Sequence, residues 1–287
     1  MKPPPFRYVV ARSLEEALSE LAGEEDAKPL AGGQSLVPAL NLRLVRPSLL
    51  VDLERAGLGG IEADGAGAVR VGATVLQADL ERSSLAHPLV RDALPHVGHV
   101  ATRNRGTVGG SIAHADGGAE LPLCLTALGG VAVVEGPSGR REIAPDDLFV
   151  THFTTTIGPG ELLVETRWPS PHPGEGSAFE ELALRAGDYA LVAVAVVLRR
   201  EDGVARDVRI AAGAVVDRPT LLAEAASALE GRAVDAEAAR EAGVRAAAAV
   251  DPVETMHASV PYLRHVTAAL VERAVARAWA TAPAGAP

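Results

Sequence analysis

The sequence predicts an α+β protein whose strands and helices alternate in the first part of the chain and are separated in the last part. Up to about residue 170, short runs of β-forming residues alternate with helix candidates. The segment PSPHPGEG at 169–176 combines three prolines with two glycines, and beyond it three strand candidates precede three helix candidates. This order is typical of a sheet covered by helices. The pattern therefore indicates a separate C-terminal α+β domain.

The first 57 residues predict a small lobe with a βαβ-like order. Ser13 and Glu16 have the spacing of a capping box, which opens a helix that runs to Leu21. β-forming and apolar runs predict strands on both sides of this helix. The strand candidates are 6–11, 28–31 and 49–53. The GLGG segment at 57–60 marks the end of the lobe.

The middle of the chain, residues 58–172, mixes helices and strands. Helical spacing predicts three helices, the last with Pro122 in its first turn. The helix candidates are 74–80, 88–100 and 121–128, with a short one at 145–150. The strand candidates are 69–73, 131–135 and 161–168, and a β-turn is expected at 136–139.

The C-terminal domain, residues 177–287, predicts a sheet followed by alanine-rich helices. The expected strands are 178–184, 189–199 and 204–216. The expected helices are 219–229, 235–250 and 261–281. The last helix can present an interaction face, but its pattern favours a solvated helix surface.

The composition excludes several classes of function. The formal net charge is −10 and the pI is near 5.3, which argues against nucleic acid or an anionic membrane surface as a partner. Lys2 and Lys28 are the only lysines, so a Schiff-base or phosphate-loop lysine has almost no candidate. No apolar run approaches the length of a membrane span, and the N-terminus lacks an apolar signal region. We therefore expect a cytoplasmic protein without a membrane span.

The single cysteine, Cys124, limits the redox chemistry of the chain. It cannot form an intrachain disulfide, and an iron–sulfur cluster needs about four thiolates. Because Cys124 lies in an apolar helix candidate, we expect it in the core.

The stretch RNRGTVGGSIAHADGGAELP, residues 103–122, does not resemble a core segment, because it is rich in glycine, hydroxyl and charged residues. Gly109 and Gly110 in tandem favour positive φ and close approach to another molecule, and consecutive free amides in such a turn form an anion-binding concavity. The hydroxyls of Thr107 and Ser111 flank the turn and can donate to phosphate oxygens. The alternative is a plain surface loop.

The stretch LAGGQSLVPALNLRL, residues 30–44, shows the same chemistry upstream. A strand candidate leads into a turn at Gly32 and Gly33, and Ser35 is placed to cap a following amphipathic segment. The leucines on its expected apolar face are Leu36, Leu40 and Leu44. A lone glycine pair is usually a structural turn, whereas two pairs, each beside a Ser or Thr, indicate a diphosphate held from both sides.

Other patterns favour structural interpretations. His96 and His99, with His87 and His114 nearby, lack the carboxylate or cysteine that would complete a zinc site, so no metal ligand is assigned. The segment GAGAVR at 65–70 has an arginine where a dinucleotide fingerprint needs its third glycine. The P-loop and nucleophile-elbow patterns do not occur.

The motifs AGGQSL at 31–36, NRGTVGGSIAHAD at 104–116 and AELP at 119–122 resemble the FAD-binding medium subunit of the molybdenum hydroxylases. This family includes carbon monoxide dehydrogenase and the FAD domain of xanthine dehydrogenase. GPGELL at 158–163 and RAGDYA at 185–190 extend the resemblance over most of the chain. It implies a two-lobed FAD-binding domain of the PCMH type, related to the vanillyl-alcohol-oxidase fold, followed by a C-terminal domain that shields the flavin ring.

The resemblance also implies roles for individual residues and no catalytic side chain. Asp116 and Glu120 are acidic candidates for sugar hydroxyls, Leu163 for the ring edge, and Asp188 with Tyr189 for the far side of the ring. The segments implied for the diphosphate and ribityl parts comprise Ala31, Gly32, Gly33, Gln34, Ser35 and Leu36, and Thr107, Val108, Gly109, Gly110 and Ser111.

Three points qualify these assignments. Tyr189 has an alternative, purely structural interpretation as a half-buried strand residue. The sequence departs from the family at Gly117–Gly118, where similar sequences often have Pro-Ala, and at Glu181, where some have Lys.

In this family a molybdenum-pterin centre on a large subunit oxidises the substrate, two [2Fe-2S] clusters on a small subunit conduct the electrons, and FAD passes them to a final acceptor. The resemblance therefore implies an oxidoreductase subunit that transfers electrons through FAD and assembles with both partners, as a dimer of heterotrimers. The FAD is expected to be noncovalent, because AGGQS holds no His or Cys for attachment. The alternatives are a stand-alone FAD-dependent oxidoreductase of the wider fold and a non-catalytic nucleotide-binding module.

Overall fold

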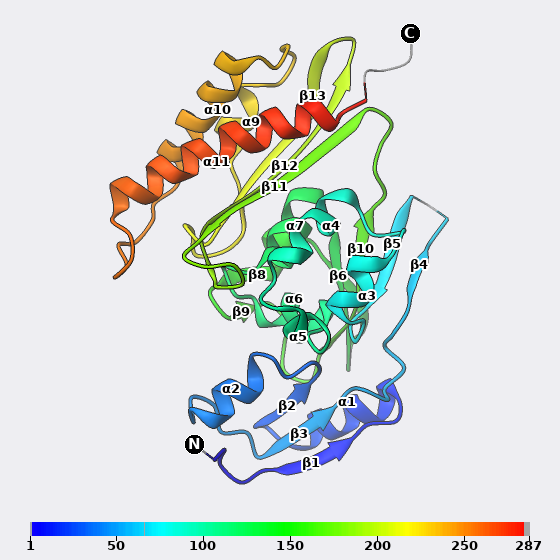
Figure 1. The fold of residues 1–287 in the computed structure, drawn as a ribbon. Coiled ribbons are helices and arrows are strands. Elements are labelled where there is room, and N and C mark those ends of the chain that lie inside the picture. Colours follow the sequence, from blue (N-terminus) through cyan, green and yellow to red (C-terminus); the bar gives the residue numbers. More distant parts are fainter. Residues whose placement is uncertain (1, 66, 284–287) are drawn as a thin grey trace.

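The computed structural model describes residues 2–65 and 67–283. Ala66 of the segment 65–70, and the outermost ends of the ranges 1–57 and 177–287, lie outside the described residues. Three sheets of three to five strands follow one another along the chain, and a two-stranded sheet pairs Phe149–Thr151 with Thr154–Thr155. The N-terminal lobe lies at one end of the molecule and the C-terminal helices at the other (Figure 1).

The N-terminal lobe is a parallel sheet with the order β1-β3-β2, as the βαβ-like pattern predicts. The capping box is confirmed in part, because the Ser13 hydroxyl accepts from the Glu16 amide. The Glu16 carboxylate accepts from the amide of Arg12, one residue before the N-cap, and not from that of Ser13. The elements are β1 (Arg7–Val10), α1 (Leu14–Gly23), β2 (Ala27–Leu30), α2 (Leu36–Asn41) and β3 (Leu49–Asp52).

The expected apolar face of the second helix is only partly correct. Leu40 is buried, but α2 ends at Asn41 and Leu44 is 74% exposed. Arg43 adopts a positive φ of 60°, which turns the chain away from the helix. Ser35 occupies the N-cap position of α2, but its side chain makes no capping hydrogen bond.

The middle part contains an antiparallel five-stranded sheet with the order β4-β5-β10-β6-β7. These strands are β4 (Ile61–Ala63), β5 (Ala68–Gly72), β6 (Val131–Gly136), β7 (Gly139–Ile143) and β10 (Leu162–Pro169). The remaining elements are α3 (Gln77–Arg82), α4 (Pro88–Ala93), η1 (Leu94–His96), α5 (Val100–Arg103), α6 (Val108–His114), α7 (Glu120–Leu128), α8 (Pro145–Leu148), β8 (Phe149–Thr151) and β9 (Thr154–Thr155). The single helix expected at 88–100 is divided into α4, η1 and the start of α5, because Pro95 falls inside it and Gly98 has a φ of +47°.

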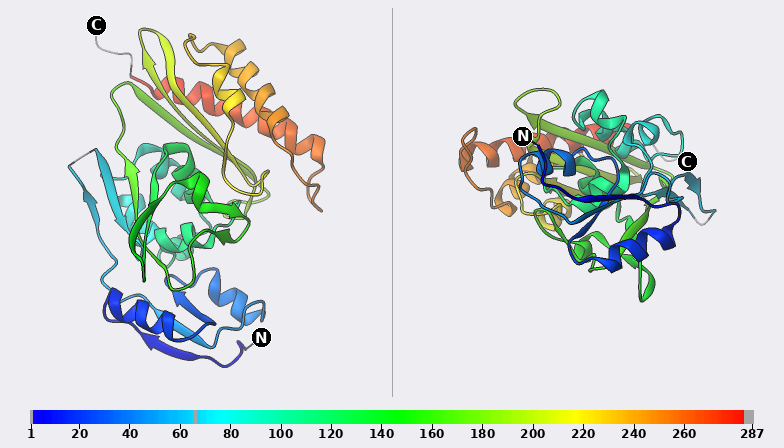
Figure 2. Two further views of the ribbon diagram at one scale, coloured as in Figure 1. Left: turned by 180° about the vertical axis from the view of Figure 1, so that it is seen from behind. Right: turned by 90° about the horizontal axis from the view of Figure 1, so that it is seen from below.

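The C-terminal sheet is antiparallel, with the order β11-β12-β13-β14, and both of its faces are covered. α10 and α11 lie on its outer face, and α7 of the middle part packs on its inner face (Figures 1 and 2). The elements are β11 (Glu175–Ala183), β12 (Ala190–Glu201), β13 (Val204–Gly213), β14 (Thr220–Leu221), α9 (Ala223–Ser227), α10 (Ala236–Ala249) and α11 (Val260–Thr281). Burial on both faces explains why β12 has a continuous apolar sequence.

The interpretation of the last helix as a mainly solvated surface is wrong for one of its faces. Leu263, Leu270 and Val271 of α11 are buried in the core that the helix forms with the sheet and α10. Gly243 of α10 allows the two helices to approach closely, since a Cβ at this position would lie 2.5 Å from the Ala268 carbonyl oxygen.

No helix within the described ranges combines the length and the apolar character needed to cross a bilayer.

Candidate functional site

The two glycine motifs, far apart in sequence, lie against each other where the N-terminal lobe meets the middle part. A Cβ on Gly32 would lie 2.2 Å from the Arg105 carbonyl oxygen and 2.7 Å from Gly106 Cα. A Cβ on Gly110 would lie 3.7 Å from Ala31 Cβ. Only glycine at position 32 allows this approach, because real Cβ atoms do not come within 3.0 Å of such neighbours.

The first motif presents a series of unused backbone donors. The amides of residues 32–36 donate to no acceptor among the described residues. Gly33 has a φ of +70°, which turns the chain after β2, and the Gln34 side chain donates to the Gly32 carbonyl at 3.1 Å. Consecutive free amides in such a turn form the concavity that suits an anion. The expected glycine turn is therefore present.

The second motif has a different conformation from the expected one. Gly109 and Gly110 lie in the first turn of α6 and are not among the glycines with positive φ. Their amides are also not free, since Gly109 donates to the Ala73 carbonyl at 3.0 Å and Gly110 donates to Thr107 Oγ1 at 3.0 Å. The expectation of positive φ and free amides here is wrong. Thr107 instead caps the helix, and the segment just after β5 accepts from its first turn.

Close packing explains the glycines of the second motif. A Cβ on Gly109 would lie 2.6 Å from Ala73 Cα, and one on Gly110 would lie 2.6 Å from Thr107 Oγ1. Val108 is buried, and its amide donates to the Val75 carbonyl at 2.9 Å. The small residues therefore allow the start of α6 to pack closely on the segment after β5, with Gly110 beside Ala31 of the first motif.

A third segment, the loop 184–189 between β11 and β12, joins the site from the C-terminal domain. Gly187 has a φ of +84°, and a Cβ there would lie 2.7 Å from His99 Cε1, so the loop packs just before α5. The Asp188 amide donates to the Arg185 carbonyl at 3.1 Å. Tyr189 precedes β12 and is 75% exposed, so the half-buried strand interpretation is wrong. The loop instead presents an exposed aromatic ring.

The remaining candidates lie on both sides of α6 and in the sheet. Asp116 accepts from the Gly118 amide at 3.0 Å, just after Ala115 ends α6 in a left-handed conformation. Leu163 is buried in β10 within the core. The glycine at 117 has a structural reason, because a Cβ there would lie 2.5 Å from His152 Cε1.

A group of ionisable side chains lies behind these segments. Glu120, the first residue of α7, is 9% exposed, and the Glu181 side chain on β11 is 4% exposed. His96 Nδ1 of η1 lies 3.7 Å from Glu181 Oε1. Burial raises the pKa of Glu120 to about 7, and the negative charge of Glu181 acts in the same direction. The pKa of His96 is raised mainly by its interaction with Glu181.

Sequence reasoning missed two residues that hold the second motif in place. Arg103 is buried and donates to Glu81 Oε2 at 2.8 Å and to the Val97 carbonyl at 3.1 Å. The Gln77 amide donates to the Gly106 carbonyl at 2.9 Å, and its side-chain Oε1 is buried without a partner among the described residues. Their partners lie at least five residues away in sequence, so no local motif signals them.

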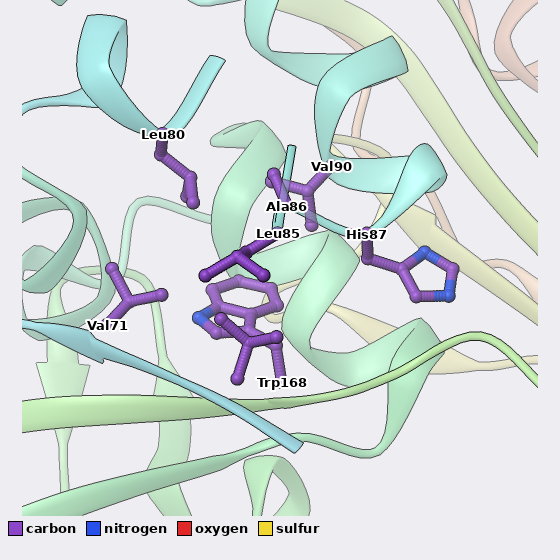
Figure 3. A pocket seen from close by; sticks show the side chains of 8 residues that line it. Val71, Leu80, Leu85, Ala86, His87, Val90 and Trp168 are labelled. Carbon is purple, nitrogen blue, oxygen red and sulfur yellow. The ribbon is translucent and has the colours of Figure 1, made fainter. Parts of the chain in front are cut away.

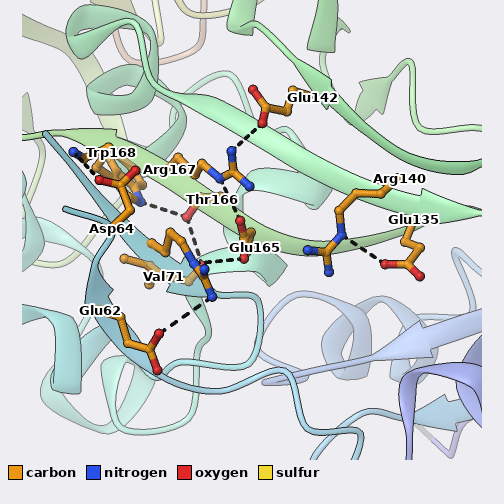
Figure 4. Close-up of polar contacts among 12 residues, drawn as sticks. Glu62, Asp64, Val71, Glu135, Arg140, Glu142, Glu165, Thr166, Arg167 and Trp168 are labelled. Atoms are coloured by element: carbon orange, nitrogen blue, oxygen red, sulfur yellow. Dashed lines mark hydrogen bonds and ion pairs between the residues drawn. The ribbon is translucent and has the colours of Figure 1, made fainter. Parts of the chain in front are cut away.

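Two hollows lie elsewhere. One is an apolar packing gap between α3–α4 and β5–β10, closed by Leu80, Val90 and Trp168 (Figure 3). The other, of about 180 Å³, lies beside the 57–60 linker. Arg70 there pairs with Glu62 and Glu165, and both carboxylates are labelled in Figure 4. The charged groups that line the second hollow are paired with one another or with neighbours, and the first hollow is an apolar packing gap. The glycine motifs therefore remain the candidate site.

No group of three or more His, Cys, Asp or Glu side chains within the described part of the chain is arranged to hold a metal ion. His96 and His99 are separated by the break at Gly98.

The family model described as "FAD binding domain in molybdopterin dehydrogenase" matches residues 4–171, and the one described as "CO dehydrogenase flavoprotein C-terminal domain" matches residues 177–278. The chain belongs to this family. It is thus an FAD-binding medium subunit of the molybdenum hydroxylase type and part of an oxidoreductase. FAD is its cofactor, and the expected family and fold class are confirmed.

Relatives match this medium subunit over nearly its whole length. The 6-hydroxypseudooxynicotine dehydrogenase complex subunit alpha of Paenarthrobacter nicotinovorans is 41% identical over 97% of this chain and 96% of its own. The carbon monoxide dehydrogenase medium chain of Hydrogenophaga pseudoflava is 35% identical over 98% of this chain and 99% of its own.

Solved structures agree with the sequence relatives. A chain of carbon monoxide dehydrogenase from Hydrogenophaga pseudoflava, in a form that lacks the Mo-pyranopterin moiety of the molybdenum cofactor, has a TM-score of 0.95 at 35% identity, covering 99% of this chain and 100% of that chain. A chain of quinoline 2-oxidoreductase from Pseudomonas putida 86 has a TM-score of 0.94 at 37% identity, covering 98% and 99%.

The Glu120→Gln variant tests the burial of this acid in the medium subunit. The native carboxyl binds its proton more tightly than an unfolded-chain glutamate, whose pKa is near 4.5. The free energy of unfolding of the wild type should therefore fall as pH rises from about 4.5 to about 7 and become level above that, by an amount on the order of 3 kcal/mol. Urea unfolding at a series of pH values should show that Glu120→Gln lacks this contribution. Equal pH dependence of the two proteins would contradict the burial argument.

Proposed function

We propose that this medium subunit binds FAD noncovalently between its N-terminal lobe and the middle part, and that FAD there accepts electrons from an iron–sulfur partner and passes them to a final acceptor. The observation that carries the proposal is the contact between the two glycine motifs, which places five unused amides of residues 32–36 beside the start of α6. A diphosphate needs such donors and a backbone without side chains in the way.

The proposal assigns a group of described residues to each part of FAD. In this proposal the amides of residues 32–36 bind the diphosphate, and the Ser111 side of α6 faces it from the other lobe. Asp116 and Glu120 lie near the ribityl and ribose hydroxyls, with Leu163 at the ring edge. The 184–189 loop covers the ring, with Asp188 and the exposed Tyr189 on its far side. The site residues are those implied by the sequence: Ala31, Gly32, Gly33, Gln34, Ser35, Leu36, Thr107, Val108, Gly109, Gly110 and Ser111.

The same proposal assigns the other redox centres to partner chains. Cys124 is buried, burial raises the pKa of its thiol, and a [2Fe-2S] cluster needs about four ligands. We therefore propose a small [2Fe-2S] subunit and a large molybdenum-pterin subunit as partners, assembled as a dimer of heterotrimers in the cytoplasm. The relative named as a dehydrogenase complex subunit supports such an assembly. The separate sheets support the proposed division into 1–57, 58–172 and 177–287.

The bound flavin should be removable without breaking a covalent bond. The first motif, AGGQS, contains no His or Cys that would attach it. Acid denaturation of the purified protein should release free FAD into the supernatant, where its absorbance bands identify it. Flavin that remains on the precipitated chain would contradict noncovalent binding.

The Gly32→Ala variant tests the contact between the motifs. Its Cβ would meet the Arg105 carbonyl oxygen at 2.2 Å, so the two lobes must separate and the amide series must move. We expect FAD retention, measured as flavin absorbance per purified chain, to fall by roughly 10²-fold, while the circular dichroism spectrum stays close to that of the wild type. Gly23→Ala is the matched control, because a Cβ there meets nothing within 4 Å. Full flavin content in Gly32→Ala would place the diphosphate elsewhere.

The partner requirement has a direct test. The FAD-loaded chain, mixed anaerobically with aldehydes, purines or carbon monoxide, should keep its oxidised flavin spectrum. Its single cysteine cannot ligate an iron–sulfur cluster, and no group arranged to hold a metal ion occurs among the described residues. Adding the small and large subunits should restore bleaching with the true substrate. Bleaching by any of these substrates without partners would favour the stand-alone oxidoreductase instead.

A further inference from the structure

Three ionisable side chains from three elements converge where the inner face of the C-terminal sheet packs on the middle part. Glu181 and Phe179 are two residues apart on β11, so they point to the same face of the sheet. His96 contacts both, with its ring centroid 5.3 Å from that of Phe179 and its Nδ1 3.7 Å from Glu181 Oε1. Glu120 at the start of α7 is the third member, because it is buried and the charges of Glu181 and His96 both act on the pKa of its carboxyl, after the larger effect of burial. We call these residues, Glu120, Glu181 and His96, the acid cluster.

The acid cluster is not a satisfied structural ion pair. Glu181 Oε2 is buried and has no hydrogen-bond partner among the described residues. A buried carboxylate oxygen without a donor costs free energy, so such an oxygen needs an explanation in a native protein. The missing partner is accounted for if a mobile proton visits this oxygen.

The two ends of the acid cluster face different surroundings. The His96 side chain is 40% exposed, so one end is open to solvent. Glu120 is at the buried end of the cluster. Tyr189 belongs to the loop that closes the cofactor cleft. In the path proposed below, Glu120 is the group between the solvent-linked pair and the cleft.

The other titratable groups around the cluster are mostly acidic. Asp92 of α4 acts on His96, and Asp116 of the α6–α7 connection acts on Glu120. Asp92 is itself paired with Arg277 of α11. Cys124 follows Glu120 by four residues on α7 and is held neutral by burial. These negative neighbours favour protonated Glu120 and protonated His96.

We propose that His96, Glu181 and Glu120 form a proton path between solvent and the cofactor cleft. This inference rests on the proposed function, because it assigns the source of the proton that accompanies flavin reduction. As two electrons arrive from the iron–sulfur partner or an artificial reductant, Glu120 releases its carboxyl proton to the flavin and becomes a carboxylate. Protonated His96 then gives its proton to Glu181 Oε2, which passes a proton on to Glu120, and His96 takes up a replacement proton from solvent. When the acceptor removes the two electrons, the proton leaves by the same groups.

The 3.7 Å gap between His96 and Glu181 fits such a path. It exceeds a hydrogen bond, and a ring rotation or one bridging water closes it. The path therefore works by small side-chain movements, without a change in the backbone.

The test measures proton uptake and flavin bleaching in the same stopped-flow mixing. The FAD-loaded full chain in weak buffer is mixed with pre-reduced methyl viologen, which donates electrons without protons, and a pH indicator dye reports uptake. We expect His96→Phe and Glu181→Gln to bleach normally but to take up their proton on the order of 10²-fold more slowly than the wild type. His96→Phe preserves a ring against Phe179. Glu272→Gln, at an exposed position of α11, is the control and should behave as the wild type.

A second measurement does not depend on FAD. The infrared spectrum of the FAD-free chain should contain a protonated-carboxyl band that disappears as pH is raised through about 7 and is missing from Glu120→Gln. Absence of this band from the wild type would overturn the path.

The possible failures are distinguishable. Wild-type uptake rates in both His96→Phe and Glu181→Gln, with FAD bound and bleached, would overturn the path and leave the proposed function intact. A wild-type chain that binds no FAD would overturn the proposed function and the path together.

Discussion

The contact of Gly32 with the Arg105 carbonyl oxygen is the constraint on which the geometry of the cofactor segments depends. It allows the turn after β2 to touch the loop before α6, although the two belong to different sheets. Any side chain at position 32 would separate the lobes, and the unused amides of the first motif would lose the opposite wall of their site. The absence of a Cβ at Gly32 therefore allows the N-terminal lobe and the middle part to form one site.

Rigid elements hold both sides of this contact. The first motif follows β2, which pairs with the central strand β3 of a parallel sheet. The second motif is held by hydrogen bonds. The carbonyls of Ala73 and Val75 accept from amides in the first turn of α6, and the Arg103 side chain, just before the motif's loop, donates to the Val97 carbonyl. The third segment depends on how the C-terminal sheet docks. There Arg277 of α11 pairs with Asp92 of α4 and with Glu180 of β11, at 2.7 Å for Glu180.

The sequence predicted the elements whose signals are local. The Ser13–Glu16 capping box, the apolar α7 and the long strands β11 to β13 all carry their pattern within a few residues. The short strands escaped detection for two reasons. β4 has only three residues, which is too few for a pattern, and exposed polar residues dominate β7. The break of the 88–100 helix at Pro95 and Gly98 was visible in the sequence, but the helical spacing on either side outweighed it.

The candidate site was predictable as a pair of motifs but not as a mechanism of binding. Gly109 and Gly110 have the sequence of a phosphate-binding turn. Only the structure shows that their amides already donate, to the Ala73 carbonyl and to Thr107 Oγ1. The exposure of Tyr189 depends on Gly187, whose positive φ directs the loop against His99. Both outcomes are set by chain segments far away in sequence, which periodicity does not report.

The acid cluster could not be predicted from the sequence. His96 and Glu181 are 85 residues apart, and neither has a local pattern that signals the other. Alternation along β11 directs Glu180 to the outer face, where Arg273 and Arg277 neutralise it, and Glu181 to the inner face, where no arginine pairs with it among the described residues. An apolar residue at 181 would pack beside Phe179 at lower cost, because a buried polar oxygen without a donor opposes folding. Glu181 therefore does not stabilise the interface by packing, since its Oε2 is buried without a donor. Burial raises the pKa of the nearby Glu120 to about 7. Together these two features are better explained by proton chemistry than by packing.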